Sequence, residues 1–180
     1  EEQIFNSIKK NKSFLDFREM LRKRDLQGDL TIIGEIKQAS PSAGKLVNNF
    51  DHLNIAKQYI DNDVKFLSVL TEEDFFLGKL KYIDDIKKKF NIPILCKDFF
   101  IDTYQISLAK SFGADCILII LYAVDGFLAK DLYQAANDLK IDTIIEVHDP
   151  KEAETSLSFE NSIIGINNRN LDTLKVSLDT

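Results

Sequence analysis

The chain has 180 residues, of which 44% are hydrophobic and 29% are charged, and its formal net charge is −6. These values are typical of one globular domain with a sizeable core. The negative charge and the lack of a long basic run disfavour nucleic acid as a partner. No stretch approaches the roughly 18 consecutive apolar residues of a membrane helix. The first twenty residues are charged and amphipathic, so we expect no signal peptide and a cytoplasmic protein.

The first expected element is an amphipathic helix over residues 4–26, interpreted as an extra helix that caps one end of the fold. Six apolar, strand-like runs follow, at residues 30–36, 65–70, 92–96, 115–121, 143–147 and 162–166. Segments with helical spacing of apolar residues lie between them. The strand ends recur about every 25–30 residues, which is the length of one βα unit and predicts a parallel sheet.

Two parallel-sheet architectures compete. A doubly wound sheet usually has a glycine-rich turn after its first strand, which is missing here in a chain with only 7 glycines. A (β/α)₈ TIM barrel instead gathers functional polar residues at the carboxyl ends of many strands. This second pattern occurs after the runs that end near residues 37, 97, 147 and 168. We therefore predict an α/β, TIM-barrel domain.

A barrel needs about eight strands to close without exposed edges. With six predicted strands, residues 1–180 are expected to form a single barrel domain that is truncated after about six βα units and incomplete at its carboxyl end. The two missing units are where barrels often place a phosphate site.

Glu35 and Lys37 are two apart on the first strand and so point to one face. They could form an acid and a cation beside a ligand in the barrel mouth, or a structural ion pair. The small-residue segment 39–44 that follows, with Ser40 in it, could let a ligand approach the backbone or could be a simple turn.

Lys97 ends an apolar strand, where partial desolvation would make it a usable general acid or Schiff-base nucleophile. The alternative is a lysine neutralised by Asp98 or Glu146. Glu146 closes another buried strand and is a candidate general base. His148 lies further out on the same face and is interpreted as a loop or cap residue.

Asn167 and Arg169 share one face after the sixth run, and the Arg169 guanidinium suits a carboxylate or phosphate. Phe76 and Phe99 follow strand ends and could line an aromatic wall, although core packing is the commoner role of a phenylalanine.

Three other features receive structural interpretations. Cys96 and Cys116 lie in strand-like runs without metal-ligand spacing, so we expect reduced, buried thiols. The basic run 87–89 is interpreted as a solvated helix face, and His52, which opens a helix, as a surface residue.

Taken together, these segments resemble indole-3-glycerol-phosphate synthase across essentially the whole chain. The matching stretches, in the family's order and spacing, are residues 33–44, 67–72, 75–78, 93–99, 113–115, 146–148 and 165–171. The family's later motifs, a strand ending in Glu-Ser-Gly and a glycine-rich phosphate loop, are absent because the chain ends first. Residues 62–64 also depart from a usual Gly-Ala turn, which affects a loop and not the site.

The resemblance implies ring closure of 1-(2-carboxyphenylamino)-1-deoxyribulose 5-phosphate with loss of CO₂ and water, in tryptophan biosynthesis, with no metal or organic cofactor. It implies Lys97 as general acid, Glu146 as a carboxylate that pairs with this lysine, and Glu35 as the acid/base in dehydration. Further roles are implied for anion-binding Lys37 and Arg169, the positioning residue Asn167, and the substrate-binding residues Ser40, Phe76, Phe99 and Leu118.

Two alternatives stay open. One is another phosphate-binding barrel, such as the isomerase acting one step earlier, which does not explain Lys97 together with Glu146. The other is a non-catalytic, six-strand association module, which predicts exposed sheet edges and no turnover. The expected partner is a phosphorylated small molecule, with neither nucleic acid nor membrane. The sequence does not determine the oligomeric state, and a monomer is compatible with it.

Overall fold

The computed structural model describes residues 4, 8, 14–173 and 175–178. Six parallel strands form one curled sheet in the order β1-β4-β5-β6-β7-β8. Their bounds are β1 (Ile33–Ile36), β4 (Phe66–Leu70), β5 (Ile94–Lys97), β6 (Cys116–Ile120), β7 (Asp142–Val147) and β8 (Ile163–Ile166). Parallel neighbours need crossover connections, and helices supply them. The result is the half-barrel of TIM type that the sequence predicted.

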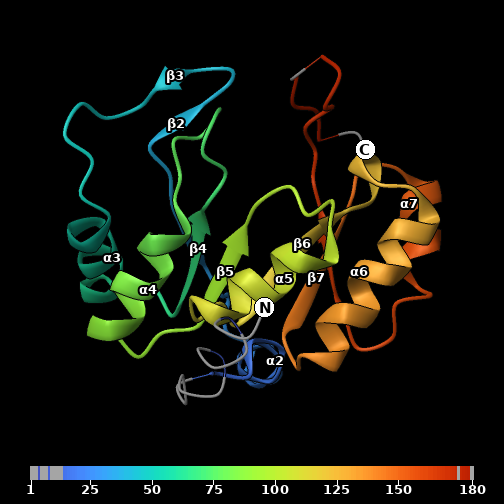
Figure 1. Cartoon of the computed structure of the whole chain (residues 1–180), viewed down its shortest axis with the longest axis horizontal. Coiled ribbons are helices and arrows are strands. Elements are labelled where there is room, and N and C mark those ends of the chain that lie inside the picture. The colour runs from blue at the N-terminus through green and yellow to red at the C-terminus, as the bar shows by residue number, and fades with distance from the viewer. Residues whose placement is uncertain (1–3, 5–7, 9–13, 174, 179–180) are drawn as a thin grey trace.

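The crossover helices cover the outer face of the sheet, as Figure 1 shows. They are α3 (His52–Asp61), α4 (Leu80–Lys89), α5 (Thr103–Ser111), α6 (Gly126–Asp138) and α7 (Pro150–Ser156), with the short 3₁₀ turn η1 (Leu121–Ala123) before α6. Aspartates cap most of their amino ends; Asp102, for example, forms a complete capping box with Gln105 at the start of α5.

Alternation along the strands separates two apolar layers. On β4, Leu67 and Val69 point outward to the helices, while Phe66 points inward. The outward layer continues through Ile94, Cys96, Ile117, Ile119, Ile145 and Val147, and the inward layer through Leu95, Cys116, Leu118 and Ile144. The inward layer fills the amino-terminal half of the half-barrel. The inward-pointing residues nearer the carboxyl ends of the strands line a pocket instead.

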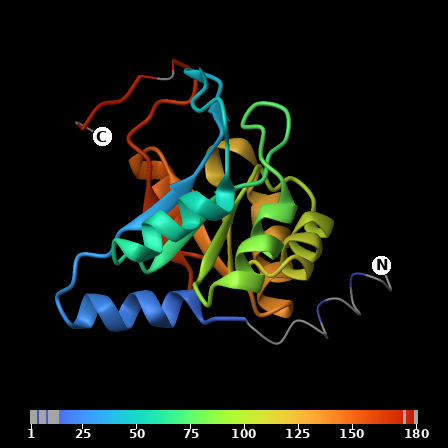
Figure 2. The same ribbon diagram turned by 90° about the vertical axis from the view of Figure 1, so that its left-hand side faces the viewer.

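Helix α2 (Phe17–Leu26) lies under the amino ends of the strands, where an extra helix was expected (Figure 2). Phe17 is fully buried in the inward layer and packs edge-on against Phe66, with ring centroids 4.9 Å apart. The backbone amide of Arg18 donates to Asp142 Oδ2 at 2.9 Å. The helix begins at Phe17 because the Asp16 side chain caps it; residues 1–3, 5–7 and 9–13 of the predicted segment 4–26 lie outside the described residues.

Strand β1 is shorter than predicted. It begins at Ile33, where its pairing with Phe66 begins, while Leu30 and Ile32 before it are exposed. Gly34 in this strand allows close approach of α3: a Cβ atom there would lie 2.9 Å from Cγ of Tyr59. The Tyr59 hydroxyl donates to the Glu35 carbonyl at 3.1 Å, so this contact fixes the backbone beside a predicted site residue.

The segment after β1, for which the sequence predicts only a loop or turn, folds into a small hairpin. Strands β2 (Ala39–Ser40) and β3 (Gly44–Lys45) pair antiparallel, and Gly44 takes the left-handed conformation with φ of 64°. The hairpin stands above the carboxyl ends of the strands, opposite α2 (Figure 2). It therefore forms part of the rim of the pocket.

Two structural interpretations from the sequence were wrong in part. Lys88 is solvated, but Lys87 of the same run is buried and pairs with Asp115, with Nζ 2.9 Å from Oδ2. The Asp115 carboxylate also accepts the backbone amide of Ile94. Its negative charge is balanced by the Lys87 ammonium group. The sequence of a basic run does not show which of its residues points from the helix toward the sheet.

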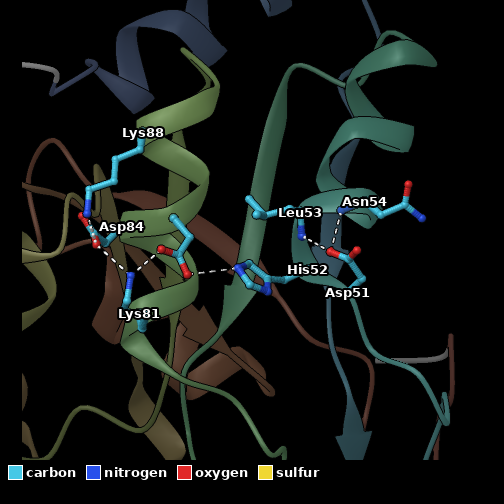
Figure 3. A network of polar contacts seen from close by, with 8 residues as sticks. Asp51, His52, Leu53, Asn54, Lys81, Asp84 and Lys88 are labelled. Carbon is cyan, nitrogen blue, oxygen red and sulfur yellow. Dashed lines mark hydrogen bonds and ion pairs between the residues drawn. The ribbon is translucent and has the colours of Figure 1, made fainter.

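His52 opens α3 as predicted but is not a surface residue. Its side chain is 17% exposed, stacks on Tyr82 with centroids 4.4 Å apart, and lies 3.3 Å from Asp85 on α4. Figure 3 shows the ion pair of His52 with a carboxylate of α4, beside the pairs that Lys81 and Lys88 make with Asp84.

No helix in the described part of the chain is long and apolar enough to cross a membrane.

Candidate active site

A cavity of about 460 Å³ opens at the carboxyl ends of the strands. It is lined by Glu35, Lys37, Ser40, Pro41, Ser42, Leu70, Glu72, Phe75, Phe76, Lys97, Asp98, Phe99, Leu118, Ile120, Glu146, Asn167, Arg169 and Leu171. All the candidate site residues from the sequence lie in this lining. Barrels place their functional groups at this end of the sheet.

Strand periodicity explains why the charged groups meet. Lys97 lies two residues after the inward Leu95, and Glu146 lies two residues after the inward Ile144. Glu35 likewise follows Ile33, which packs on the inward layer. Each of these side chains therefore points into the half-barrel, one level above its apolar floor.

Glu35 bridges two lysines. Its Oε1 lies 2.5 Å from Lys37 Nζ and its Oε2 lies 2.8 Å from Lys97 Nζ. Burial acts to raise the pKa of the Glu35 carboxyl, but the charge of Lys97 and the hydrogen bonds from both lysines outweigh it, so the pKa lies below the usual 4.5. The carboxylate is thus ionised at neutral pH, between two ammonium groups.

The pairing of Lys97 differs from the one that the resemblance implied. Its ion pair is with Glu35 on β1, whereas Glu146 Oε1 accepts a hydrogen bond from Asn167 Nδ2 at 3.0 Å. Asn167 Oδ1 in turn accepts the amide of Arg169 at 3.0 Å. The amide side chain of Asn167 therefore links Glu146 to the segment that carries Arg169.

His148 occupies the bend after β7, as the sequence indicated, but its ring is largely buried. The side chain is 9% exposed, with Nε2 3.3 Å from Glu146 Oε1 and Nδ1 3.2 Å from Glu152 Oε2. Its position on the Glu146 face was readable from strand parity, while its partner Glu152 on α7 was not.

Glu72 is a site residue that the sequence analysis missed. Its carboxylate accepts the backbone amides of Asp74, Phe75 and Phe76 at 2.8–2.9 Å. This carboxylate holds the loop after β4 in place, and the Phe76 carbonyl accepts the amide of Ala39 at 3.2 Å. The only available signal was an acidic residue three positions before an aromatic pair, which is too common to be specific.

The expected aromatic wall comes from two loops, with Phe76 after β4 and Phe99 after β5. The Phe76 and Phe99 rings lie 6.3 Å apart at 52°, a tilted arrangement. Phe99 is 41% exposed, and Leu118 contributes the apolar floor beneath. The cavity lining thus contains apolar side chains as well as the ionic groups, so the site suits a ligand with an aromatic part and an anionic part.

Asp98, which the sequence suggested only as a partner for Lys97, is a further carboxyl in the cavity lining. Burial raises its pKa, and Thr71 Oγ1 donates to its Oδ2 at 2.5 Å. Thr71 Oγ1 also lies 3.3 Å from the sulfur of Cys96, which is fully buried on the outer side of β5. Burial raises the pKa of the Cys96 thiol to about 12, so this sulfur remains a protonated, structural group.

Within residues 14–173 and 175–178 no three histidine, cysteine, aspartate or glutamate side chains are grouped so that they could hold a metal ion. The acidic groups of the cavity are instead engaged by lysines, by Asn167 and by backbone amides.

The family model described as indole-3-glycerol phosphate synthase matches residues 1–180. The chain belongs to the indole-3-glycerol phosphate synthase family. It is similar to the enzyme of that name from Thermoanaerobacter sp. (strain X514), with 43% identity over 179 residues, covering 99% of this chain and 66% of the relative. The Burkholderia lata protein of the same name is 42% identical over 165 residues, covering 92% of this chain and 63% of the relative. The chain thus spans a little under two thirds of the length of these curated family members.

Solved structures support the fold alone. The protein named KGPDC from Streptococcus mutans superimposes with a TM-score of 0.55 at 15% identity, covering 75% of this chain and 64% of the other. The 3-hexulose-6-phosphate synthase from Salmonella typhimurium gives a TM-score of 0.51 at 18% identity, covering 62% and 57%.

Proposed function

We propose that the cavity catalyses the indole-3-glycerol phosphate synthase reaction, in which 1-(2-carboxyphenylamino)-1-deoxyribulose 5-phosphate closes to indole-3-glycerol phosphate with loss of CO₂ and water. The observation that carries the proposal is the position of Lys97, an ammonium group held 2.8 Å from Glu35 within a cavity that also has an aromatic side. We place the reaction in the cytoplasm, because two buried free thiols suit a reducing compartment.

Lys97 is the general acid that protonates the substrate carbonyl as the aromatic carbon attacks it. Transfer of its proton to the carbonyl oxygen neutralises the negative charge that develops there in the transition state. Glu35 keeps this ammonium oriented before the substrate arrives. The pKa of Glu35 lies below the usual value, so the carboxyl is ionised and has the form that can accept a proton in the later dehydration.

The substrate's ends are recognised by different sides of the cavity. Lys37 and Arg169 supply positive charge for its anionic groups, with Ser40 on the rim hairpin. Phe76, Phe99 and Leu118 pack against its carboxyphenyl ring and lower the local dielectric, which strengthens the charge interactions at the reacting carbon. Asn167 holds Glu146, which assists proton transfer during the reaction.

The test is product formation followed by indole fluorescence. The chain contains no tryptophan, so indole emission that develops during incubation with the substrate comes from product. Lys97→Met is expected to lower kcat by about 10²–10⁴-fold, the usual contribution of a positioned general acid. Lys57→Met is the matched control, because Lys57 is an exposed lysine of α3 whose partner is Asp61. No product from the unmodified chain, or equal rates for the unmodified chain and Lys97→Met, would contradict the proposal.

A further inference from the structure

His148 lies between two carboxylates that come from different elements. Glu146 ends β7 on one side of the ring, and Glu152 of α7 lies on the other. The three side chains are 9–16% exposed, so this line of groups is largely shielded from water. In the described chain it joins the first turn of α7 to the candidate active site.

One half of the line is fixed firmly. Glu152 Oε2 accepts the backbone amide of His148 at 2.8 Å and also lies 3.2 Å from the ring Nδ1. Glu152 itself is held because its amide donates to the helix cap Asp149 at 2.7 Å. The Tyr122 ring meets the imidazole at 5.8 Å and 60°, an edge contact that limits rotation of the ring.

The other half faces the catalytic candidate. His148 Nε2 is buried and makes no hydrogen bond of good geometry among the described residues, so the Glu146 carboxylate at 3.3 Å is the polar group that offsets its loss of water. Asn167 Nδ2 donates to the same oxygen, Oε1. Asn167 and His148 thus both contact Oε1 of Glu146. These two contacts fix the rotation of the carboxylate and leave its other oxygen for a ligand.

We propose that His148 is a positioning residue for Glu146, with Glu152 as the group that orients the imidazole. Its ring, held by Glu152, places Nε2 against Glu146 Oε1 and keeps the second oxygen of Glu146 available for the transferred proton. The inference rests on the proposed function, because it assigns His148 its role through Glu146. Among the polar groups that face the ring are Glu146 from β7 and Glu152 from α7; Asn167 acts through Glu146.

The experiment compares steady-state kinetics of the unmodified protein with His148→Ala and His148→Gln. His148→Ala is expected to lower kcat about 10–100-fold, the effect of misplacing a reacting group by about 1 Å. KM should stay within about twofold, because Lys37 and Arg169, which bind the anionic ends, are untouched. His148→Gln should recover most of kcat, since its amide N–H can reach the place of Nε2.

The other histidine of the chain provides the matched control. His52 also packs against an aromatic ring and lies 3.3 Å from a carboxylate, but at the α3–α4 contact away from the cavity lining (Figure 3). His52→Ala should therefore lower the melting temperature without changing kcat. A purely structural role for His148 would give the same pattern as His52.

A second comparison isolates the path through Glu146. In a Glu146→Gln background, His148→Ala should have no further effect on kcat, because residues that act through one group are not additive. An undiminished effect in that background, or equal kcat in the unmodified protein and His148→Ala, overturns this inference and leaves the proposed function standing. Absence of product from the unmodified protein instead refutes the proposed function, and this inference falls with it.

Discussion

The buried pair between Lys87 and Asp115 gives the sharpest stability prediction. In Lys87→Met the methylene stem stays packed, but Asp115 loses an ammonium group that lies 2.9 Å and 3.2 Å from its two oxygens. The side chains are only 5% and 0% exposed, so water cannot replace the lost partner. Removing one member of a buried pair costs about 3–5 kcal/mol.

The structure places the cost near the lower end of that range. Asp115 keeps two backbone donors in the variant, the amide of Leu15 at 2.7 Å and that of Ile94 at 2.8 Å. We therefore expect a loss of about 3 kcal/mol in the free energy of unfolding at pH 7. With a urea m-value of about 2 kcal/mol/M, the unfolding midpoint should fall by about 1.5 M.

The neighbouring lysine is the control. Lys88 pairs with Asp84 at 2.6 Å, but its side chain is 65% exposed, so Lys88→Met should cost about 0.5 kcal/mol or less. Burial already raises the pKa of the Asp115 carboxyl, so the Lys87→Met defect should shrink as the pH is lowered and the carboxyl takes up a proton. Equal midpoints for Lys87→Met and Lys88→Met at pH 7 would refute the reasoning.

Three further outcomes are expected. The pKa of Glu35 lies below its usual 4.5, so its ion pairs stabilise the folded protein above that pH. This stabilisation is lost as the pH falls through the lower, folded-state pKa. The urea unfolding midpoint of Glu35→Gln should therefore differ from that of the parent at pH 7 and converge with it in strong acid. Cys96 and Cys116 are fully buried, and burial raises the pKa of both thiols, so a disulfide reagent should label them only at the rate of unfolding; fast labelling of the folded protein would contradict this. Glu72→Ala releases three backbone amides of the loop that carries Phe76, so KM measured with the substrate should rise several-fold more than in Glu72→Gln, which keeps one acceptor oxygen.

Periodicity made the fold and much of the site predictable. The residues at positions 35, 97 and 146 follow apolar strand residues at a spacing of two, which places Lys97 on the same face as Leu95 and Glu146 on the same face as Ile144. The order of parallel strands then brings them to one edge of the sheet. All of this depends on spacing along the chain, which a single sequence contains.

Partnerships between elements were harder to predict. Lys97 was assigned to Glu146 but pairs with Glu35, because its neighbour across the sheet depends on curvature and rotamer and not on spacing. The buried position of Lys87 depends on which turn of α4 faces the start of β6. Glu72 accepts three backbone amides of a loop in which Leu77 adopts a positive φ of 54°. A leucine rarely adopts this conformation, so the sequence does not predict the turn.

The division of each strand into an apolar lower part and a charged upper part bears on how such a protein can change. On β5 the buried Leu95 belongs to the floor, while Lys97 two residues later belongs to the chemistry. Substitutions at the upper positions exchange reactive groups with little loss of the packing that holds the sheet together. New specificities can therefore be sought at positions 35, 97 and 146 and in the hairpin loop while the packing of the sheet is kept. Changes at Leu95 or Ile144 would instead destabilise the sheet on which any such activity depends.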